Sequence, residues 1–146
     1  MDSQQDILLQ RLAFTSYMQT DAASLDSLAS ATQNLIVMLN ADPVKYPEVL
    51  DNVVIVPEVL REFPADTFRV AYADLPASQA IAKRFGILKF PALLFLRQGE
   101  YVGIIAGLQD WPDIVHSFAD KLTAPTRRPP SVGIPVTSAS SEKGCA

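Results

Sequence analysis

Apolar and polar positions along the chain separate helical from extended segments. Helical spacing of apolar residues, or a run of small residues, marks five segments: 7–18, 22–31, 52–63, 77–85 and 111–122. Apolar runs of strand length mark four more: 35–39, 68–73, 92–96 and 101–106. The run at 35–39 is continuous rather than alternating, which is typical of a central strand covered on both faces. A short strand near 14–18 is compatible with the same pattern.

The order of these segments predicts how the strands pair. A strand, a helix and a second strand in succession, as in 35–73, require parallel pairing through a right-handed crossover. The strands 92–96 and 101–106 are joined by Gln98-Gly99 and should form an antiparallel hairpin. The sequence therefore predicts an α/β protein with a mixed sheet and helices on both faces. Pro57, inside the third helical segment, should kink that helix or start a second piece of it.

A glycine and a proline punctuate the stretch between the fourth helical segment and the hairpin, Phe85-Gly86-Ile87-Leu88-Lys89-Phe90-Pro91. Gly86 suits the left-handed position that commonly follows the last turn of a helix. Pro91 stands where two apolar runs meet, so it belongs at the first residue of a strand or in a tight buried turn. The residues alone leave a cis and a trans bond before Pro91 open, and trans bonds are far commoner.

The chain has 146 residues, enough for one domain with a substantial core, which we place at 1–122. Its last helix should follow Asp110 as N-cap, with these residues facing inward: Leu108, Ile114, Val115, Phe118 and Leu122. Residues 123–146 are rich in Pro, Gly and Ser and are predicted to be a flexible tail. The pair Arg127-Arg128 lies in this tail, but two prolines follow it, so it does not resemble an export signal.

Charge, cysteine and histidine content exclude several kinds of partner and site. The net charge is −4, and residues 1–122 carry 9 basic and 15 acidic residues, a net of −6, which argues against nucleic acid and permits a basic partner. A single cysteine, Cys145, excludes an internal disulfide, and a single histidine, His116, cannot form a multi-histidine metal site. We predict no metal and no cofactor. The polar, acidic start and the absence of a long apolar run predict a cytoplasmic protein without membrane insertion.

Residues 84–95, Arg-Phe-Gly-Ile-Leu-Lys-Phe-Pro-Ala-Leu-Leu-Phe, resemble the segment of thioredoxins in which a helix, a Gly-Ile pair, a proline and a strand follow one another. The resemblance implies a thioredoxin-like three-layer α/β/α fold with a mixed central sheet and a cis bond before Pro91. In thioredoxins a C-x-x-C motif follows the central strand, where the helix terminus lowers a thiol pKa. Here that place, 40–48, has no cysteine, so thiol–disulfide exchange is not expected.

A narrower resemblance covers about residues 35–122. Its motifs are Asp42-Pro43, Pro47-Glu48-Val49, Asp51-Asn52, Glu58, Leu60-Arg61-Glu62-Phe63-Pro64, Val70-Ala71, Ala73-Asp74-Leu75, Arg84-Phe85-Gly86 and Phe90-Pro91-Ala92. With the cysteine-free loop, they resemble the thioredoxin-like hydrogenase expression/formation proteins of the HyaE/HupG/HoxO type. The resemblance implies a non-enzymatic chaperone for the small-subunit precursor of an uptake nickel-iron hydrogenase, which carries a twin-arginine signal peptide and is held before export. Other hydrogenase accessory proteins are further expected partners.

A receptor for such a signal needs carboxylates beside an apolar surface, because the signal is basic at its start and apolar in its middle. The candidate acidic residues are Asp42, Glu48, Asp51, Glu58 and Glu62, of which the last two should share one helix face. The candidate apolar part consists of Phe90, Pro91 and Trp111. In thioredoxins the backbone just before the cis proline pairs with extended peptide, a form of strand addition. The alternatives are a solvated acidic helix face and ordinary core packing of the aromatic residues.

Two other functions compete with this hypothesis. One is a cysteine-dependent oxidoreductase or peroxidase of thioredoxin fold, against which the missing C-x-x-C argues. The other is a permanent structural subunit of the maturation complex that uses the same surface as a stable interface. An insulin-reduction assay tests the first alternative, and size-exclusion chromatography with and without the precursor tests the second.

Overall fold

The computed structural model describes residues 3–130, and its strands form a single five-stranded sheet. The strands are β1 (Met18–Gln19), β2 (Leu35–Leu39), β3 (Arg69–Ala73), β4 (Ala92–Arg97) and β5 (Glu100–Ala106). They lie in the order β1-β3-β2-β4-β5, with β1, β3 and β2 parallel and with β4 antiparallel to both β2 and β5. The predicted mixed sheet and hairpin are confirmed, and the early short strand forms at β1, at the end of the predicted stretch.

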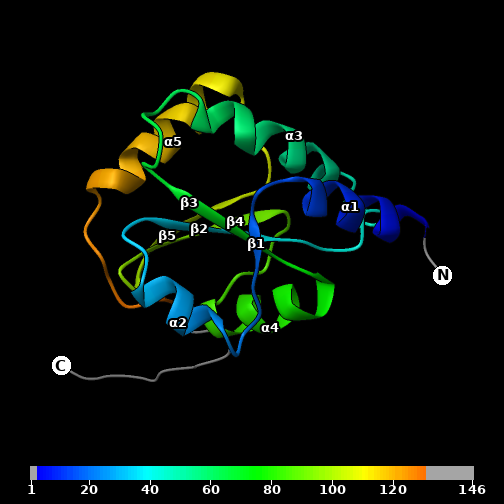
Figure 1. The fold of residues 1–146 in the computed structure, drawn as a ribbon, viewed down its shortest axis with the longest axis horizontal. Coiled ribbons are helices and arrows are strands. Elements are labelled where there is room, and N and C mark those ends of the chain that lie inside the picture. The colour runs from blue at the N-terminus through cyan, green and yellow to red at the C-terminus, as the bar shows by residue number, and fades with distance from the viewer. Residues whose placement is uncertain (1–2, 131–146) are drawn as a thin grey trace.

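Helices cover both faces of this sheet. They are α1 (Ser3–Phe14), α2 (Leu25–Ser30), α3 (Glu48–Leu60), α4 (Leu75–Phe85) and α5 (Trp111–Thr123). Helices α1, α3 and α5 lie on one face, and α2 and α4 lie on the other (Figure 1). None of the helices within 3–130 is long and apolar enough to cross a membrane.

The alternation of side chains along the strands produces two apolar cores. In β2, Ile36 and Met38 pack in the cluster that includes α1, α3 and α5, whereas Leu35, Val37 and Leu39 pack in the cluster that includes α2 and α4. All five residues of β2 are buried. The continuous apolar run at 35–39 is thus explained by a strand that is covered on both faces.

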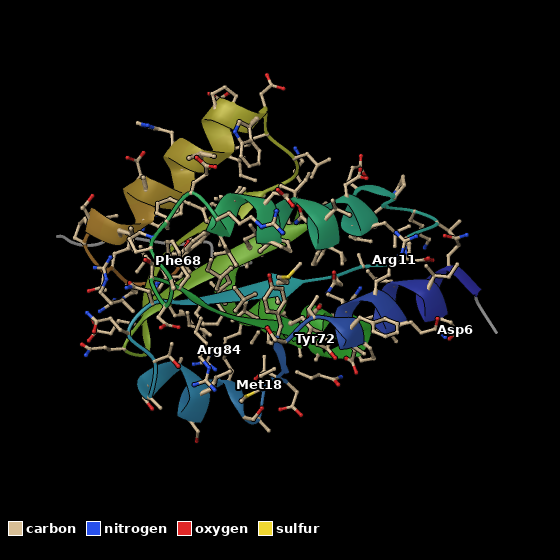
Figure 2. The ribbon with its side chains drawn as sticks, turned by 45° about the horizontal axis from the view of Figure 1, so that its top comes forward. Asp6, Arg11, Met18, Phe68, Tyr72 and Arg84 are labelled. Atoms are coloured by element: carbon tan, nitrogen blue, oxygen red, sulfur yellow. The ribbon has the colours of Figure 1, made fainter. Side chains whose placement is uncertain are left out.

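Four phenylalanine rings join the helical layer to the sheet on the α3/α5 face. They are Phe63, Phe68, Phe95 and Phe118, with ring centroids 5.3–6.4 Å apart in the contacting pairs. Most of these pairs meet edge to face, a geometry that adds about 0.5–1.5 kcal/mol per pair beyond burial. Phe68 comes directly before β3 and Tyr72 lies near its end, so aromatic side chains stand at both ends of this strand (Figure 2).

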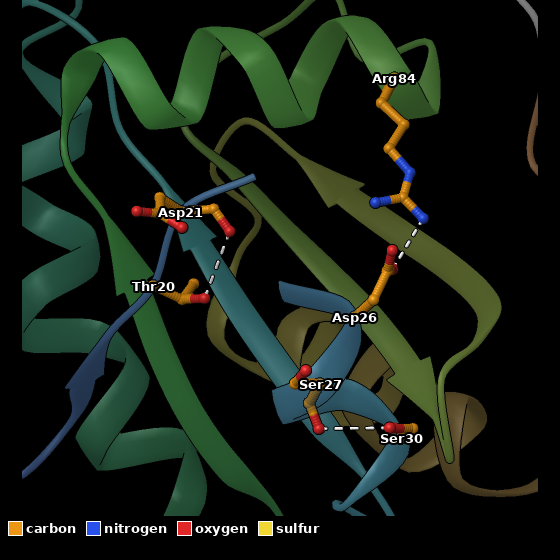
Figure 3. Close-up of polar contacts among 6 residues, drawn as sticks. All are labelled: Thr20, Asp21, Asp26, Ser27, Ser30 and Arg84. Carbon is orange, nitrogen blue, oxygen red and sulfur yellow. Dashed lines mark hydrogen bonds and ion pairs between the residues drawn. The ribbon is translucent and has the colours of Figure 1, made fainter. Parts of the chain in front are cut away.

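Polar contacts join α2 and α4 on the opposite face. The guanidinium of Arg84 in α4 lies 2.8 Å from a carboxylate oxygen of Asp26 in α2 (Figure 3). Both side chains remain largely exposed, so this ion pair contributes at most about 1 kcal/mol. Arg84 thereby links the last turn of α4 to the short helix α2.

The expectations for α3, Leu108 and Glu62 differ from the structure. Helix α3 begins at Glu48 rather than near residue 52, and it continues through Pro57 to Leu60 without a break, because buried valines on its core face hold it against the sheet. Leu108, expected inside, is 39% exposed, since it lies on the connection between β5 and α5 rather than on the helix. Glu62 lies beyond the end of α3, so it does not extend a helical face with Glu58.

The start of the predicted tail packs against the domain. The guanidinium of Arg97 donates to the carbonyl oxygen of Ala124 at 2.8 Å, and the backbone N–H of Arg127 donates to the carbonyl oxygen of Tyr101 at 2.8 Å. The expectation that nothing after Leu122 packs is therefore wrong for residues 124–127. Residues 131–146, which include Cys145, lie outside the described residues, and the division into 1–122 and 123–146 stays a prediction.

Candidate functional site

Three connecting segments meet at one end of the strands β2, β4 and β5. Leu39, the last residue of β2, pairs with Ala92, the first residue of β4, and Ala92 also pairs with Ala106, the last residue of β5. The segments 40–47, 86–91 and 107–110 therefore leave or enter the sheet side by side. This is the end of the sheet at which thioredoxins carry their redox motif and cis proline.

Asn40 fixes the base of the first segment. Its side-chain amide donates to the carbonyl oxygen of Ala73 at 2.9 Å, and its backbone N–H donates to the hydroxyl of Ser78 at 2.8 Å. The Ser78 hydroxyl in turn donates to the carbonyl oxygen of Ala73 at 3.0 Å. Asn40 and Ser78 are buried, so these bonds connect the ends of β2 and β3 to α4 away from water.

Asp42 builds the turn that follows. Its carboxylate accepts a hydrogen bond from the backbone N–H of Val44 at 2.9 Å, and its carbonyl oxygen accepts bonds from Lys45 at 3.1 Å and Tyr46 at 2.8 Å. An aspartate that bonds its own chain two residues ahead is a common turn former. The turn presents Val44 and Tyr46 to solvent, with 66% and 38% of each residue exposed.

The second segment places Pro91 between the other two, at this end of the strands. Gly86 ends α4 in the left-handed conformation, with φ of 71°, as predicted. The bond between Phe90 and Pro91 is cis, which confirms the implication of the resemblance to thioredoxins. The carbonyl oxygen of Pro91 accepts a hydrogen bond from the N–H of Gly107 at 2.7 Å, and this bond joins the second and third segments.

The backbone before Pro91 is open to pairing. The N–H and C=O groups of Leu88, Lys89 and Phe90 make no hydrogen bond to any other residue within 3–130. Leu88 is 80% exposed, and Lys89 is also exposed. Backbone groups that are not paired within the protein can pair with an added peptide strand.

Apolar side chains that are exposed or half-buried occur on all three segments and at the start of α5. We call the following six residues the apolar patch: Val44, Tyr46, Leu88, Phe90, Leu108 and Trp111. Five of them are exposed and Phe90 is half-buried, with its ring in edge contact with Tyr46 at a centroid distance of 6.0 Å. A groove between α4 and the second segment, lined by Gln79, Lys83, Ile87 and Leu88 among others, adjoins the patch. Exposed apolar patches of this kind mark interaction surfaces.

The predicted acidic residues do not form one cluster. Glu48, the first residue of α3, and Asp51, in its first turn, are exposed beside the segment 40–47. Glu58 lies ten residues further along α3, about 15 Å at 1.5 Å per residue, and pairs with Arg61 at 3.1 Å. The structure therefore places Glu48 and Asp51 next to the segment 40–47, and it places Glu58 and Glu62 at the other end of α3 and beyond it. Asp42 lies before α3, in the segment 40–47, but uses its carboxylate in the turn.

The three apolar candidates, Phe90, Pro91 and Trp111, differ in exposure. Pro91 is buried, Phe90 packs against both cores with part of its ring exposed, and Trp111 is 46% exposed at the start of α5. Trp111 is thus available to a partner rather than enclosed in the core. Within 3–130 no three His, Cys, Asp or Glu residues come together as metal ligands.

Sequence reasoning missed most of the apolar patch. Val44, Tyr46 and Leu88 lie in stretches rich in proline, glycine and charge, where periodicity gives no direction for a side chain. Apolar residues within such connections are a weak signal of a binding surface, because connections usually run over the outside of a protein. Only Phe90 and Trp111 were identified, through the resemblance and the helix start.

The fold and this surface define a class: a thioredoxin-fold protein whose redox position holds no cysteine. The structure of a mutant thioredoxin from Halobacterium salinarum matches with a TM-score of 0.57 at 22% identity, over 77% of this chain and 99% of that chain. At this identity the likeness shows the fold alone. The crystal structure of a hydrogenase expression/formation protein, HupG, from Rhodopseudomonas palustris matches with a TM-score of 0.50 at 26% identity, over 72% of this chain and 94% of that chain.

The chain belongs to the HyaE family of hydrogenase expression/formation proteins. Residues 8–114 match the family described as Hydrogenase-1 expression protein HyaE. The chain is 39% identical over 127 residues to the hydrogenase expression/formation protein HoxO of Cupriavidus necator, a match that covers 86% of this chain and 78% of that protein. It is 33% identical over 115 residues to HupG of Bradyrhizobium diazoefficiens, over 76% and 74% of the two chains. The predicted family is confirmed.

Proposed function

We propose that this protein is a non-catalytic chaperone that acts in the cytoplasm and binds the twin-arginine signal of a hydrogenase small-subunit precursor before export. Membership of a family of hydrogenase expression/formation proteins supports a role in hydrogenase maturation. The observation that carries the binding role is the apolar patch beside the unpaired backbone of Leu88, Lys89 and Phe90. A non-catalytic role is supported by the absence of any cysteine from 40–48, since thiol–disulfide exchange needs a thiolate.

The apolar middle of the signal would lie on the apolar patch. A bound peptide in extended form would exchange backbone hydrogen bonds with Leu88, Lys89 and Phe90, as in strand addition. Its alternate side chains would contact Tyr46 and Phe90 on one side and Leu108 and Trp111 on the other. Burial of one leucine-sized side chain contributes about 1.5–3 kcal/mol, so three such contacts offset the cost of ordering a short peptide.

The basic start of the signal would meet the carboxylates next to the patch. Glu48 and Asp51 lie on the first turn of α3 and remain exposed. A guanidinium can bind a carboxylate through two parallel hydrogen bonds, but exposed pairs contribute only about 0–1 kcal/mol and weaken in salt. The apolar contacts therefore provide most of the affinity in this proposal, and the carboxylates provide selectivity for basic signals.

Calorimetric titration of the protein with a synthetic signal peptide tests the proposal. We expect binding of the full signal, a large loss when its apolar middle is replaced by serine and glycine, and a smaller, salt-sensitive loss when both arginines are replaced by glutamine. No binding of the signal alongside tight binding of the mature small subunit would contradict the proposal. Reduction of insulin by the protein would contradict the non-catalytic role.

A further inference from the structure

The chain after α5 crosses the open edge of the sheet. β5 is the last strand in the sheet order, so its outer edge has no partner strand within the described residues. The segment 124–130, which we call the strap, leaves α5 on one face and passes around β5 toward the face that carries α2 (Figure 1). Edge strands present backbone groups to which another chain can pair. The strap therefore covers the edge at which an external strand would otherwise add.

Few contacts hold the strap on this edge. The N–H of Arg127 donates to the carbonyl oxygen of Tyr101 at 2.8 Å, and the hydroxyl of Thr126 lies 2.9 Å from a carboxylate oxygen of Glu100. Within 3–130, the first of these is the only backbone hydrogen bond between the strap and β5. Three strap residues are prolines, Pro125, Pro129 and Pro130, which have no N–H to donate. Besides these contacts, the strap is held at its start by the hydrogen bond from Arg97 to the carbonyl oxygen of Ala124, so along the β5 edge itself it is held by one backbone bond and side-chain contacts.

Arg127 of the strap lies against the ring of Tyr101, and we call this position the arginine seat. The guanidinium of Arg127 lies 5.5 Å from the ring centroid of Tyr101, within the range of a cation–π contact. The Tyr101 ring stacks on Phe85 at 6.0 Å and 19°, and the guanidinium of Arg84 lies 5.0 Å from the Phe85 ring centroid. Arg84 belongs to α4 and also pairs with Asp26 of α2, so both of its contacts are to the folded domain. Arg127 belongs to the strap and can leave without disturbing this stack.

We propose that the β5 edge is a docking site for an extended, arginine-bearing segment of the partner, and that Arg127 fills its arginine position in the free protein. Arg127 and Thr126 show which chemistry fits there: a flat cation on Tyr101 beside a polar contact to Glu100. The identity of the partner as a signal-bearing precursor rests on the proposed function. The seat and its occupation by the strap do not.

The position of this seat relative to the apolar patch supports the assignment. From Tyr101 to Ala106 is five residues along β5, about 17 Å at 3.3 Å per residue. Leu108 of the apolar patch lies just beyond that end of the strand. A segment that placed an arginine on Tyr101 and then ran parallel to β5 would bring residues about five positions later onto the patch. This order, basic first and apolar later, is the order of the signal. An arginine on Tyr101 cannot also meet Glu48 or Asp51, so for that arginine this placement replaces the one given in the proposed function.

Two peptides and full-length variants test the proposal by calorimetric titration. The first peptide carries two adjacent arginines among polar residues and no apolar stretch, and the second is the whole signal. Arg127→Ala should bind the first peptide about three- to tenfold more tightly than the wild type, because removal of a competing occupant raises the fraction of open sites. The matched control Arg128→Ala, an exposed neighbour, should change its affinity less than about twofold. Adding Tyr101→Leu to Arg127→Ala should abolish the gain.

The outcomes separate this proposal from the proposed function. Unchanged or weaker binding of the first peptide by Arg127→Ala would overturn the docking site, and so would a gain that survives Tyr101→Leu. If that double variant does not fold, the NMR signals of the Tyr101 ring in Arg127→Ala should move on addition of the first peptide, and their failure to move overturns the site. Substitution of Leu88 should weaken the whole signal and leave the first peptide unaffected. A gain with the first peptide, together with no binding of the whole signal through Leu88, supports the site and contradicts the proposed function.

Discussion

Leu88 offers the sharpest test of the apolar patch. The residue is 80% exposed in the free protein, and its backbone lies in the unpaired stretch before Pro91. If a bound signal covers it, the gain is about 80% of the 1.5–3 kcal/mol for burial of a whole leucine side chain, or about 1.2–2.4 kcal/mol. Leu88→Ser should therefore weaken binding of the signal peptide about seven- to fiftyfold in calorimetric titration.

A matched control removes the same kind of side chain elsewhere. Phe14 is 91% exposed and is the last residue of α1. It comes before β1, which runs parallel to β3 and β2, so it lies toward the start of these strands, whereas the patch lies at the end of β2. Phe14→Ser should change the affinity less than about twofold, and both variants should keep the free energy of unfolding within about 0.5 kcal/mol, because neither side chain is buried. Equal losses in the two variants, or wild-type binding by Leu88→Ser, would refute the placement of the signal on the patch.

Three further predictions concern the acidic residues, the C-terminal segment and the cysteine. Glu48→Gln with Asp51→Asn should weaken signal-peptide binding a few-fold at low salt. Glu58→Gln with Glu62→Gln should leave binding nearly unchanged, because Glu58 lies about 15 Å from Glu48 along α3 and Glu62 lies beyond the helix. Equal effects of the two double variants in calorimetry would contradict this division of the acidic residues. Truncation after Pro130 should leave the midpoint of thermal unfolding unchanged. Truncation after Leu122 removes the Ala124 carbonyl that accepts from Arg97, so it should lower the midpoint by about 4–8 °C, corresponding to about 1–2 kcal/mol. Identical midpoints would show that the strap contacts add no stability. Cys145→Ser should leave hydrogenase maturation in cells intact, because the chain has no second cysteine with which to exchange; loss of hydrogenase activity would revive a thiol-based role.

The sequence predicted the sheet better than it predicted the helices. The strands at 35–39 and 92–96 lie within a residue of their observed bounds, since continuous apolar runs between turn residues have few other interpretations. Helix α3 was misplaced at both ends. Pro57 suggested a break, but burial of Val53, Val56 and Val59 outweighs the one hydrogen bond that a proline removes. Tertiary packing of this kind is invisible to local pattern.

The candidate site was predictable only in part. The cis bond before Pro91 followed from a resemblance, not from composition, and the structure confirms it. The acidic set was drawn from residues near one another in sequence, and a helix that spans ten residues from Glu48 to Glu58 separates them in space. The contact of Arg127 with Tyr101 joins residues far apart in the sequence across a sheet edge, and no periodicity indicates such a contact.

The buried hydrogen bonds of Asn40 decide where the chain can move. The hydrogen bonds within the turn at 42–46 are all made to Asp42, whereas displacement of Asn40 would break bonds shared with Ala73 and Ser78. Amide hydrogens of the turn should therefore exchange with solvent well before that of Asn40. A turn that adjusts above a fixed base can present Val44 and Tyr46 at slightly different heights, with only a few residues to order on binding. Such a surface suits a class of apolar sequences that share hydrophobicity rather than a fixed order of side chains.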